Sequence, residues 1–458
     1  MSARTDLRES ARDLLAADAA KIAAVMLGIY VTYLLVGLIL GYSANGMINT
    51  LQRLTFLVAI YAMVVLALNL HWGYTGLFNI GVAGFMAVGL YTMAMLAKPV
   101  EPTGGAQYPG LGLPVPIAIL GGVLAAALVG FVVALPALRL RADYFAIVTI
   151  AFAEIVRLLY TASPFQEFTI FGYTMGTGGG RGILFNFQDP VVTIYRLPIF
   201  EGPVTFVNQY VEFGPADAQG VIYVGLLVVV LAGYYLLLKR TGESPFGRVL
   251  KAIREDEEAT NALGKNTNAF KIKSFMLGCA LMGLVGILWQ FRRAGITPDA
   301  FRPHVTFYIW IALIIGGAGS NTGSILGAGI FTAGLFEGPQ YLRRIIQSQI
   351  SVGQPPGTFA DAVGPMFALN FQPITSYLFN NMLTLQFVFM GVVLVWLMQN
   401  RPDGLLGYRT ETAAAVPLGK RSDEVSETVH RADEPSETVS GTDGTSETAS
   451  REDEVSDQ

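Results

Sequence analysis

Few residues in this chain of 458 could carry out a reaction. The sequence holds three histidines and one cysteine, which supply no metal cluster, and no nucleophile lies beside a recognisable base. A phosphate-binding loop needs the pattern G-x-x-x-x-G-K-[ST]. The nearest match is Gly264-Lys265, but Asn266 follows it and Ala259 occupies the position of the first glycine. The sequence therefore predicts no enzyme activity and no metal or cofactor bound by this chain.

Two ionisable residues lie inside an apolar segment, where a lone charge is costly. Glu154 and Arg157 are one helical turn apart, so their side chains can pair on one face of a helix. A structural ion pair and a contact with a transported solute are both open interpretations.

The longest charged run in the apolar part of the chain is Gly247–Gly264, GRVLKAIREDEEATNALG. Residues 254–263 are rich in helix formers, and Gly264 predicts a C-terminal stop. The run is either a solvated loop helix or a docking helix that a soluble partner grips. The residues assigned to such a contact are Arg254, Glu255, Asp256, Glu257, Glu258, Ala259, Thr260 and Gly264.

Glycines and small polar residues gather in two apolar stretches. In a membrane segment, glycine permits close helix packing, or a broken helix whose free backbone groups line a polar cavity. Residues 73–91 and the run 316–319 show this composition, and the second run predicts a helix break. The candidate residues of a translocation path are Asn69, Gly73, Thr75, Gly76, Asn79, Gly81, Glu154, Gly317 and Gly319.

The composition predicts an all-α, polytopic integral membrane protein, because 52% of the residues are hydrophobic and 14% are charged. Uncharged runs of membrane length give about ten transmembrane segments, within a range of eight to ten. The predicted segments are 22–40, two between 53 and 98 with a turn at His71–Thr75, 114–136, 144–160, 218–238, 274–291, 305–318, 323–336 and 383–399.

Charge at the loop edges predicts the topology. Basic residues flank the loop 239–273 and place it in the cytoplasm, whereas 161–219 holds five acidic and two basic residues and is predicted to face outward. Both termini are predicted to be cytoplasmic, with 1–20 as an N-terminal segment that precedes a retained first helix and 21–408 as the transmembrane domain. Residues 409–458 carry 13 acidic and five basic residues in a ten-residue repeat, which predicts a disordered tail.

Several stretches in one order resemble the LivM-type permeases of branched-chain amino-acid ABC importers. Glu258-Ala259-Thr260, followed after three residues by Gly264, is similar to the EAA loop that couples such a permease to its ATPase, although Thr260 replaces the usual second alanine. Within the first glycine-rich stretch, 73–91, Asn79 replaces a usual serine. The stretches that carry the resemblance are 69–91, 138–158, 247–264, 316–328 and the exit at 401–405.

The resemblance implies a heteromeric importer in a prokaryotic cell membrane. The implied partners are ATPase subunits that bind ATP and Mg²⁺, a second related permease, and an extracytoplasmic solute-binding protein; no nucleic acid is implied. The implied cargo is a branched-chain or related amino acid. Urea, short amides or sugars are alternative cargoes, and a self-sufficient secondary transporter is an alternative of another class, with a channel as a further one.

Overall fold

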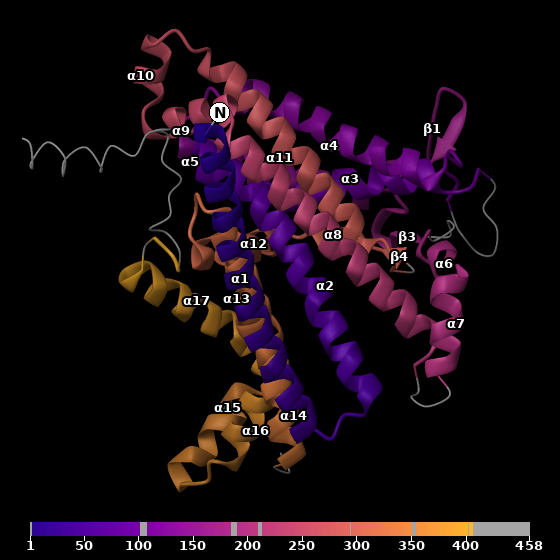
Figure 1. Cartoon of the computed structure of the whole chain (residues 1–458). Coiled ribbons are helices and arrows are strands. Elements are labelled where there is room, and N and C mark those ends of the chain that lie inside the picture. The colour runs from indigo at the N-terminus through magenta and orange to yellow at the C-terminus, as the bar shows by residue number, and fades with distance from the viewer. Residues whose placement is uncertain are drawn as a thin grey trace, which may run out of the picture. The chain divides into compact units, whose positions relative to one another are not determined.

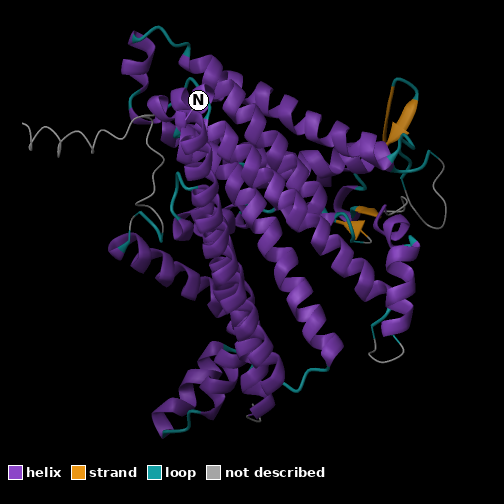
Figure 2. Ribbon diagram, in the orientation of Figure 1, coloured by secondary structure: helices purple, strands orange, loops and turns teal. Residues whose placement is uncertain are grey.

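The structure, a computed structural model, describes residues 2–100, 108–184, 190–208, 213–293, 295–349, 354–401 and 403–405. The chain divides into two units, 1–413 and 414–458, and the repeat predicted for 409–458 lies outside the described residues. The first unit is a bundle of helices with a few very short strands (Figures 1 and 2). This confirms the prediction of a mostly helical, multi-pass membrane protein.

The helices differ widely in length. They are α1 (Ser2–Ile39), α2 (Ala44–Asn69), α3 (Val82–Ala97), α4 (Val115–Ala137), α5 (Ala142–Thr161), α6 (Pro190–Tyr195), α7 (Pro198–Val207), α8 (Pro215–Glu243), α9 (Pro245–Glu255), α10 (Glu257–Ala262), α11 (Thr267–Gln290), α12 (His304–Gly316), α13 (Asn321–Ile330), α14 (Gly338–Gln349), α15 (Phe359–Val363), α16 (Gln372–Asn380) and α17 (Met382–Asn400). Single turns of π-helix extend α2 over Leu70–Tyr74 and join α13 to α14 over Phe331–Glu337.

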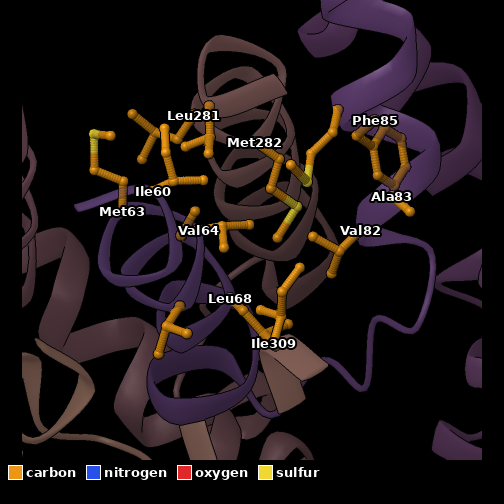
Figure 3. Packing of buried hydrophobic residues seen from close by; sticks show 14 of the residues in the cluster. Ile60, Met63, Val64, Leu68, Val82, Ala83, Phe85, Leu281, Met282 and Ile309 are labelled. Atoms are coloured by element: carbon orange, nitrogen blue, oxygen red, sulfur yellow. The ribbon is translucent and has the colours of Figure 1, made fainter. Parts of the chain in front are cut away.

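The core lies where α2, α3, α11 and α12 meet. Figure 3 shows side chains of these four helices, among them Val64, Phe85, Met282 and Ile309, in contact around one centre. Glycines let the backbones approach closely: a Cβ on Gly89 of α3 would lie 2.5 Å from the Cα of Gly283 in α11. Such close packing is typical of helix association in membranes.

Short strands form two small sheets. β1 (Phe168–Ile170) pairs with β2 (Tyr173–Met175), and β3 (Ile183–Leu184) pairs with β4 (Gly295–Ile296), both antiparallel. The second pair connects the long loop before α8 to the segment after α11. The predicted outward loop 161–219 thus contains short strands and the helices α6 and α7.

The predicted count of about ten spans is not confirmed. Within the described residues, six single helices are long and apolar enough to cross a membrane, and two bent helix pairs raise the number to at most eight. One reason is α3, whose 16 residues are fewer than the ~20 that a bilayer requires. Another is the predicted break near Gly317, because the helical stretches on either side of it, Pro298–Gly316 and Asn321–Ser348, form one pair bent by 118° instead of two separate spans.

Two local predictions are wrong. The turn expected at His71–Thr75 lies later, because the helical coil continues to Tyr74 and residues 76–81 are the ones that unwind. The single docking helix expected over 254–263 is two helices. Asp256 ends α9 with an extended backbone (φ −155°), and its carboxylate accepts the Ala259 N–H at 2.9 Å and so begins α10.

Candidate functional site

Helices α9 and α10 lie in Pro245–Gly264, which contains the residues predicted to contact a partner and is called the coupling segment after that prediction. Ser244 caps α9 by accepting the Gly247 N–H at 3.2 Å, and the buried face of α9 includes Leu250 and Ile253. Gly264 closes the segment with φ +77°, a left-handed conformation that strains a residue with a Cβ. The predicted glycine stop is therefore confirmed.

The outer face of the coupling segment combines acidic and apolar side chains. Glu255, Asp256 and Glu258 are exposed, and the Leu263 side chain is 81% exposed. Thr260 lies on the other face: it is 5% exposed, and its hydroxyl donates to the Asp256 carbonyl at 2.7 Å. The departure from alanine at Thr260 therefore affects the packing of the coupling segment and not its outer face.

The inner face of α9 contacts the place where α2 unwinds. The Arg254 Nη1 donates to the Gly73 carbonyl, and the stem of Arg254 packs on Gly76, where an added Cβ would meet the Arg254 Cγ at 3.3 Å. One turn earlier, the Lys251 Nζ lies 5.2 Å from the centre of the Tyr74 ring. A cavity of about 150 Å³ lies between α9 and this unwound stretch.

α10 is attached to α11 by polar contacts. The Glu257 carboxylate accepts from the Lys271 Nζ at 2.6 Å and from the Thr267 hydroxyl at 3.1 Å, and both partners belong to α11. Both halves of the coupling segment thus contact α11, since Phe246 of α9 stacks on Phe270 with 5.5 Å between the ring centres, and α9 additionally contacts the unwound end of α2.

The unwound stretch 76–81 is stabilised by buried polar groups. Asn79 donates to the Nδ1 of His71 at 3.2 Å, and the Nε2 of His71 lies 3.1 Å from the Phe275 carbonyl. This pairing fixes the imidazole with its proton on Nε2. Thr75 and Ser274 are joined by a hydroxyl hydrogen bond of 2.8 Å.

Gly81 ends the unwound stretch and touches α5. A Cβ at Gly81 would lie 2.4 Å from the Thr149 carbonyl oxygen, and the Thr149 hydroxyl accepts the Ile80 N–H at 3.0 Å. Glycine is required at this position because a side chain would collide with α5.

A second unwound stretch, Gly317–Ser320, contacts the end of α2. The Asn69 side-chain oxygen accepts the Gly319 N–H at 2.7 Å, and its amide donates to the Asn321 side chain at 3.2 Å. Gly73 faces the same point, since a Cβ there would lie 2.5 Å from the Gly319 nitrogen. Gly317, with φ +96°, packs against Gly404. We call this contact the break junction.

Glu154 and Arg157 do form the ion pair that their spacing predicts. Arg157 binds the Glu154 carboxylate through two nitrogens at 2.5 and 2.9 Å and Asp299 through the third at 2.7 Å. These residues join α5 to the turn before α12 and do not contact the break junction. The structure thus brings the glycine and asparagine candidates together around the two breaks and leaves Glu154 outside that group.

Sequence reasoning missed several residues of this arrangement. Lys271 was read only as charge at the edge of a loop, and Lys251, Ser274, Asn321 and Asp299 were not singled out. Lys251 precedes Arg254 by three residues, and this spacing predicts that both side chains lie on one face of a helix. In the described part of the chain, no group of three or more His, Cys, Asp or Glu side chains could hold a metal ion.

Comparison with known proteins gives consistent matches. The family described as branched-chain amino acid transport system / permease component matches residues 50–334. The chain is 35% identical over 276 residues to the high-affinity branched-chain amino acid transport system permease protein LivM of Salmonella typhimurium, covering 59% of each chain. It is 35% identical over 279 residues to the Escherichia coli protein of the same name, covering 59% of this chain and 60% of that protein.

A more distant relative is the probable branched-chain amino acid transport permease protein LivM of Methanocaldococcus jannaschii. It is 26% identical over 304 residues, which are 61% of this chain and 79% of that protein. The alignments thus span about three fifths of the two bacterial relatives. No solved structure matches the chain.

Proposed function

The chain belongs to the family described as branched-chain amino acid transport system / permease component, and we propose that it is the membrane subunit of an ABC importer for branched-chain or related amino acids. The proposal includes a second permease, ATPase subunits that bind ATP and Mg²⁺, and an extracytoplasmic solute-binding protein as partners. It places the chain in a prokaryotic cell membrane, with both termini and the coupling segment in the cytoplasm. The names of the relatives, which are branched-chain amino acid permeases, support this cargo.

The observation that carries the proposal is the coupling segment. Its outer face presents the exposed Leu263 among acidic side chains, and its inner face contacts the unwound end of α2 through Arg254. A partner that grips the outer face would therefore act directly on a discontinuous membrane helix. Discontinuous helices are common where transporters bind or pass their cargo.

Alternating access follows from this arrangement without a catalytic residue in the chain. ATP binding closes the ATPase pair, the coupling segment moves, and the solute pathway changes from outward to inward access. The ligand and ATP need only bind the two states with different affinity. In this proposal, the ion pairs of Arg157 with Glu154 and Asp299 have a structural role.

Uptake by the reconstituted complex tests the proposal. The chain, its partner permease, the ATPase subunits and the binding protein would be placed in liposomes, and ATP-dependent entry of radiolabelled leucine measured. Isoleucine and valine should compete with leucine, whereas urea, acetamide and a sugar should not. Competition by one of the latter group would identify the alternative cargo, and uptake driven by an ion gradient without ATPase subunits would identify a secondary transporter.

A further inference from the structure

Resting on the proposed function, we propose that Arg254 is a positioning residue that transmits movement of the coupling segment to the unwound end of α2. Arg254 bridges three groups: the Gly73 carbonyl, the backbone surface at Gly76, and the Glu255 carboxylate. Two of these belong to the membrane-embedded break, and the third belongs to the outer face that a partner would cover.

The Gly73 carbonyl lies where regular helical bonding ends. Leu70–Tyr74 is a π-helical turn, and residues 76–81 are not helical, so carbonyl groups near this point lack the regular partners of an α-helix. In a membrane protein, such carbonyls need another donor. Arg254 supplies one from outside the helix, so its position and that of Gly73 are coupled.

Gly76 provides the second contact. Its left-handed backbone (φ +75°) has no side chain, and this allows the Arg254 Cα to lie 3.7 Å from the position a Cβ would occupy. The backbone of α9 therefore rests directly on the unwound stretch. Because Lys251 also covers the Tyr74 ring, α9 contacts the break over one full turn of helix.

Glu255 connects this contact to the outer face. The Glu255 side chain is 67% exposed, and its carboxylate accepts from the Arg254 Nε at 3.1 Å and also from its Nη2. The planar guanidinium can hold the carboxylate and the carbonyl at once, which the single ammonium group of lysine cannot do with the same geometry. A cationic group on the partner would compete for Glu255 and so change how Arg254 is held.

Asp256, with its extended backbone, separates α9 from α10. α10 is attached to α11 through Glu257 and Lys271, and α9 contacts both α11, through Phe246 and Phe270, and the break, through Arg254. A push on the outer face that moves α9 is therefore carried to Gly73 by the Arg254 contact. Arg254 thus transmits movement of the coupling segment and does not bind the cargo.

The test compares leucine taken up per ATP hydrolysed in liposomes that contain the complete complex. Arg254→Gln and Arg254→Lys should keep ATP hydrolysis within about twofold of wild type but lower the uptake-to-hydrolysis ratio at least tenfold for glutamine and less for lysine. Arg248→Gln is the matched control, because Arg248 is an exposed arginine of the same helix. An unchanged ratio in Arg254→Gln would overturn the proposal.

A second measurement covers the case in which a variant does not assemble. Amide hydrogen exchange of residues 73–81 would be followed in the purified permease pair without ATPase subunits. Arg254→Gln should speed exchange in this stretch at least tenfold, and Arg248→Gln should not; equal rates in all three proteins would overturn the role of Arg254. If the wild-type complex shows no ATP-dependent uptake, the proposed function fails, whereas a coupled wild type with a fully coupled Arg254→Gln defeats this inference alone.

Discussion

The side-chain oxygen of Asn69 accepts the backbone N–H of Gly319 at 2.7 Å and so joins two helix breaks that are 250 residues apart. Asn69 ends α2, and Gly319 lies in the unwound turn between α12 and α13. Both groups are buried, so each supplies the hydrogen bond that the other lacks inside the bundle. Arg254 contacts the same region from the coupling segment, through the carbonyl of Gly73.

Replacement of Asn69 by leucine should destabilise the protein. Leucine has a similar size but leaves the Gly319 N–H buried without its acceptor, which costs about 1–3 kcal/mol. The unfolding temperature of the purified protein in detergent should fall clearly below that of wild type. Asn49→Leu is the control, because Asn49 is an exposed residue of the same helix. An equal decrease in unfolding temperature in both variants would contradict the stabilising role of Asn69.

Gly73→Ala tests the close approach at the break junction. A Cβ at this position would lie 2.0 Å from the Asn69 Oδ1 and 2.5 Å from the Gly319 nitrogen, so the two breaks must separate. Overpacking of this kind costs about 1–3 kcal/mol, and both the unfolding temperature and ATP-dependent uptake should decrease. Gly225→Ala is the matched control, since nothing lies within 4 Å of a Cβ there. A Gly73→Ala protein with wild-type stability would contradict the close contact between the two helix breaks.

Short sequence patterns predicted the breaks at glycine but not the split at Asp256 or the contact between Asn69 and Gly319. Gly264 and the run at Gly317 were predicted as breaks because glycine adopts positive φ at little cost, and this preference is visible in one sequence. The split at Asp256 was missed because residues 254–263 are rich in helix formers throughout, whereas the Asp256 side chain caps a new helix at this position. The contact of Asn69 with Gly319 depends on helix packing across most of the chain, and no local spacing encodes it.

Arg157→Gln distinguishes a structural ion pair from a cargo contact. Arg157 is 16% exposed and binds two carboxylates, Glu154 on its own helix and Asp299 on the turn before α12. Loss of both pairs should lower the unfolding temperature, while the KM for leucine uptake should remain unchanged. Arg302→Gln is the control, because Arg302 is 55% exposed and pairs with Asp299 at 2.9 Å. A tenfold rise in KM with unaltered stability would instead support cargo contact.

Gly264→Val tests the end of the coupling segment. Nothing lies within 4 Å of a Cβ at Gly264, so the cost comes from the left-handed backbone (φ +77°) and amounts to about 1–2 kcal/mol. The segment should fray, and stimulation of ATP hydrolysis by the loaded binding protein should fall severalfold. Gly264→Asn should be nearly silent, because asparagine tolerates this backbone conformation. Two indistinguishable variants would show that the glycine conformation does not matter for coupling.

The central claim is that a separate ATPase drives this chain through the outer face of the coupling segment. Leu263→Asp tests it most directly, because that side chain is 81% exposed and its replacement leaves the interior of the protein intact. Leu369→Asp is the matched control, a leucine of equal 81% exposure outside the coupling segment. The measurement is ATP-dependent leucine uptake by the complete complex in liposomes. The account predicts at least a tenfold loss for Leu263→Asp and little change for Leu369→Asp; wild-type uptake by Leu263→Asp would contradict it.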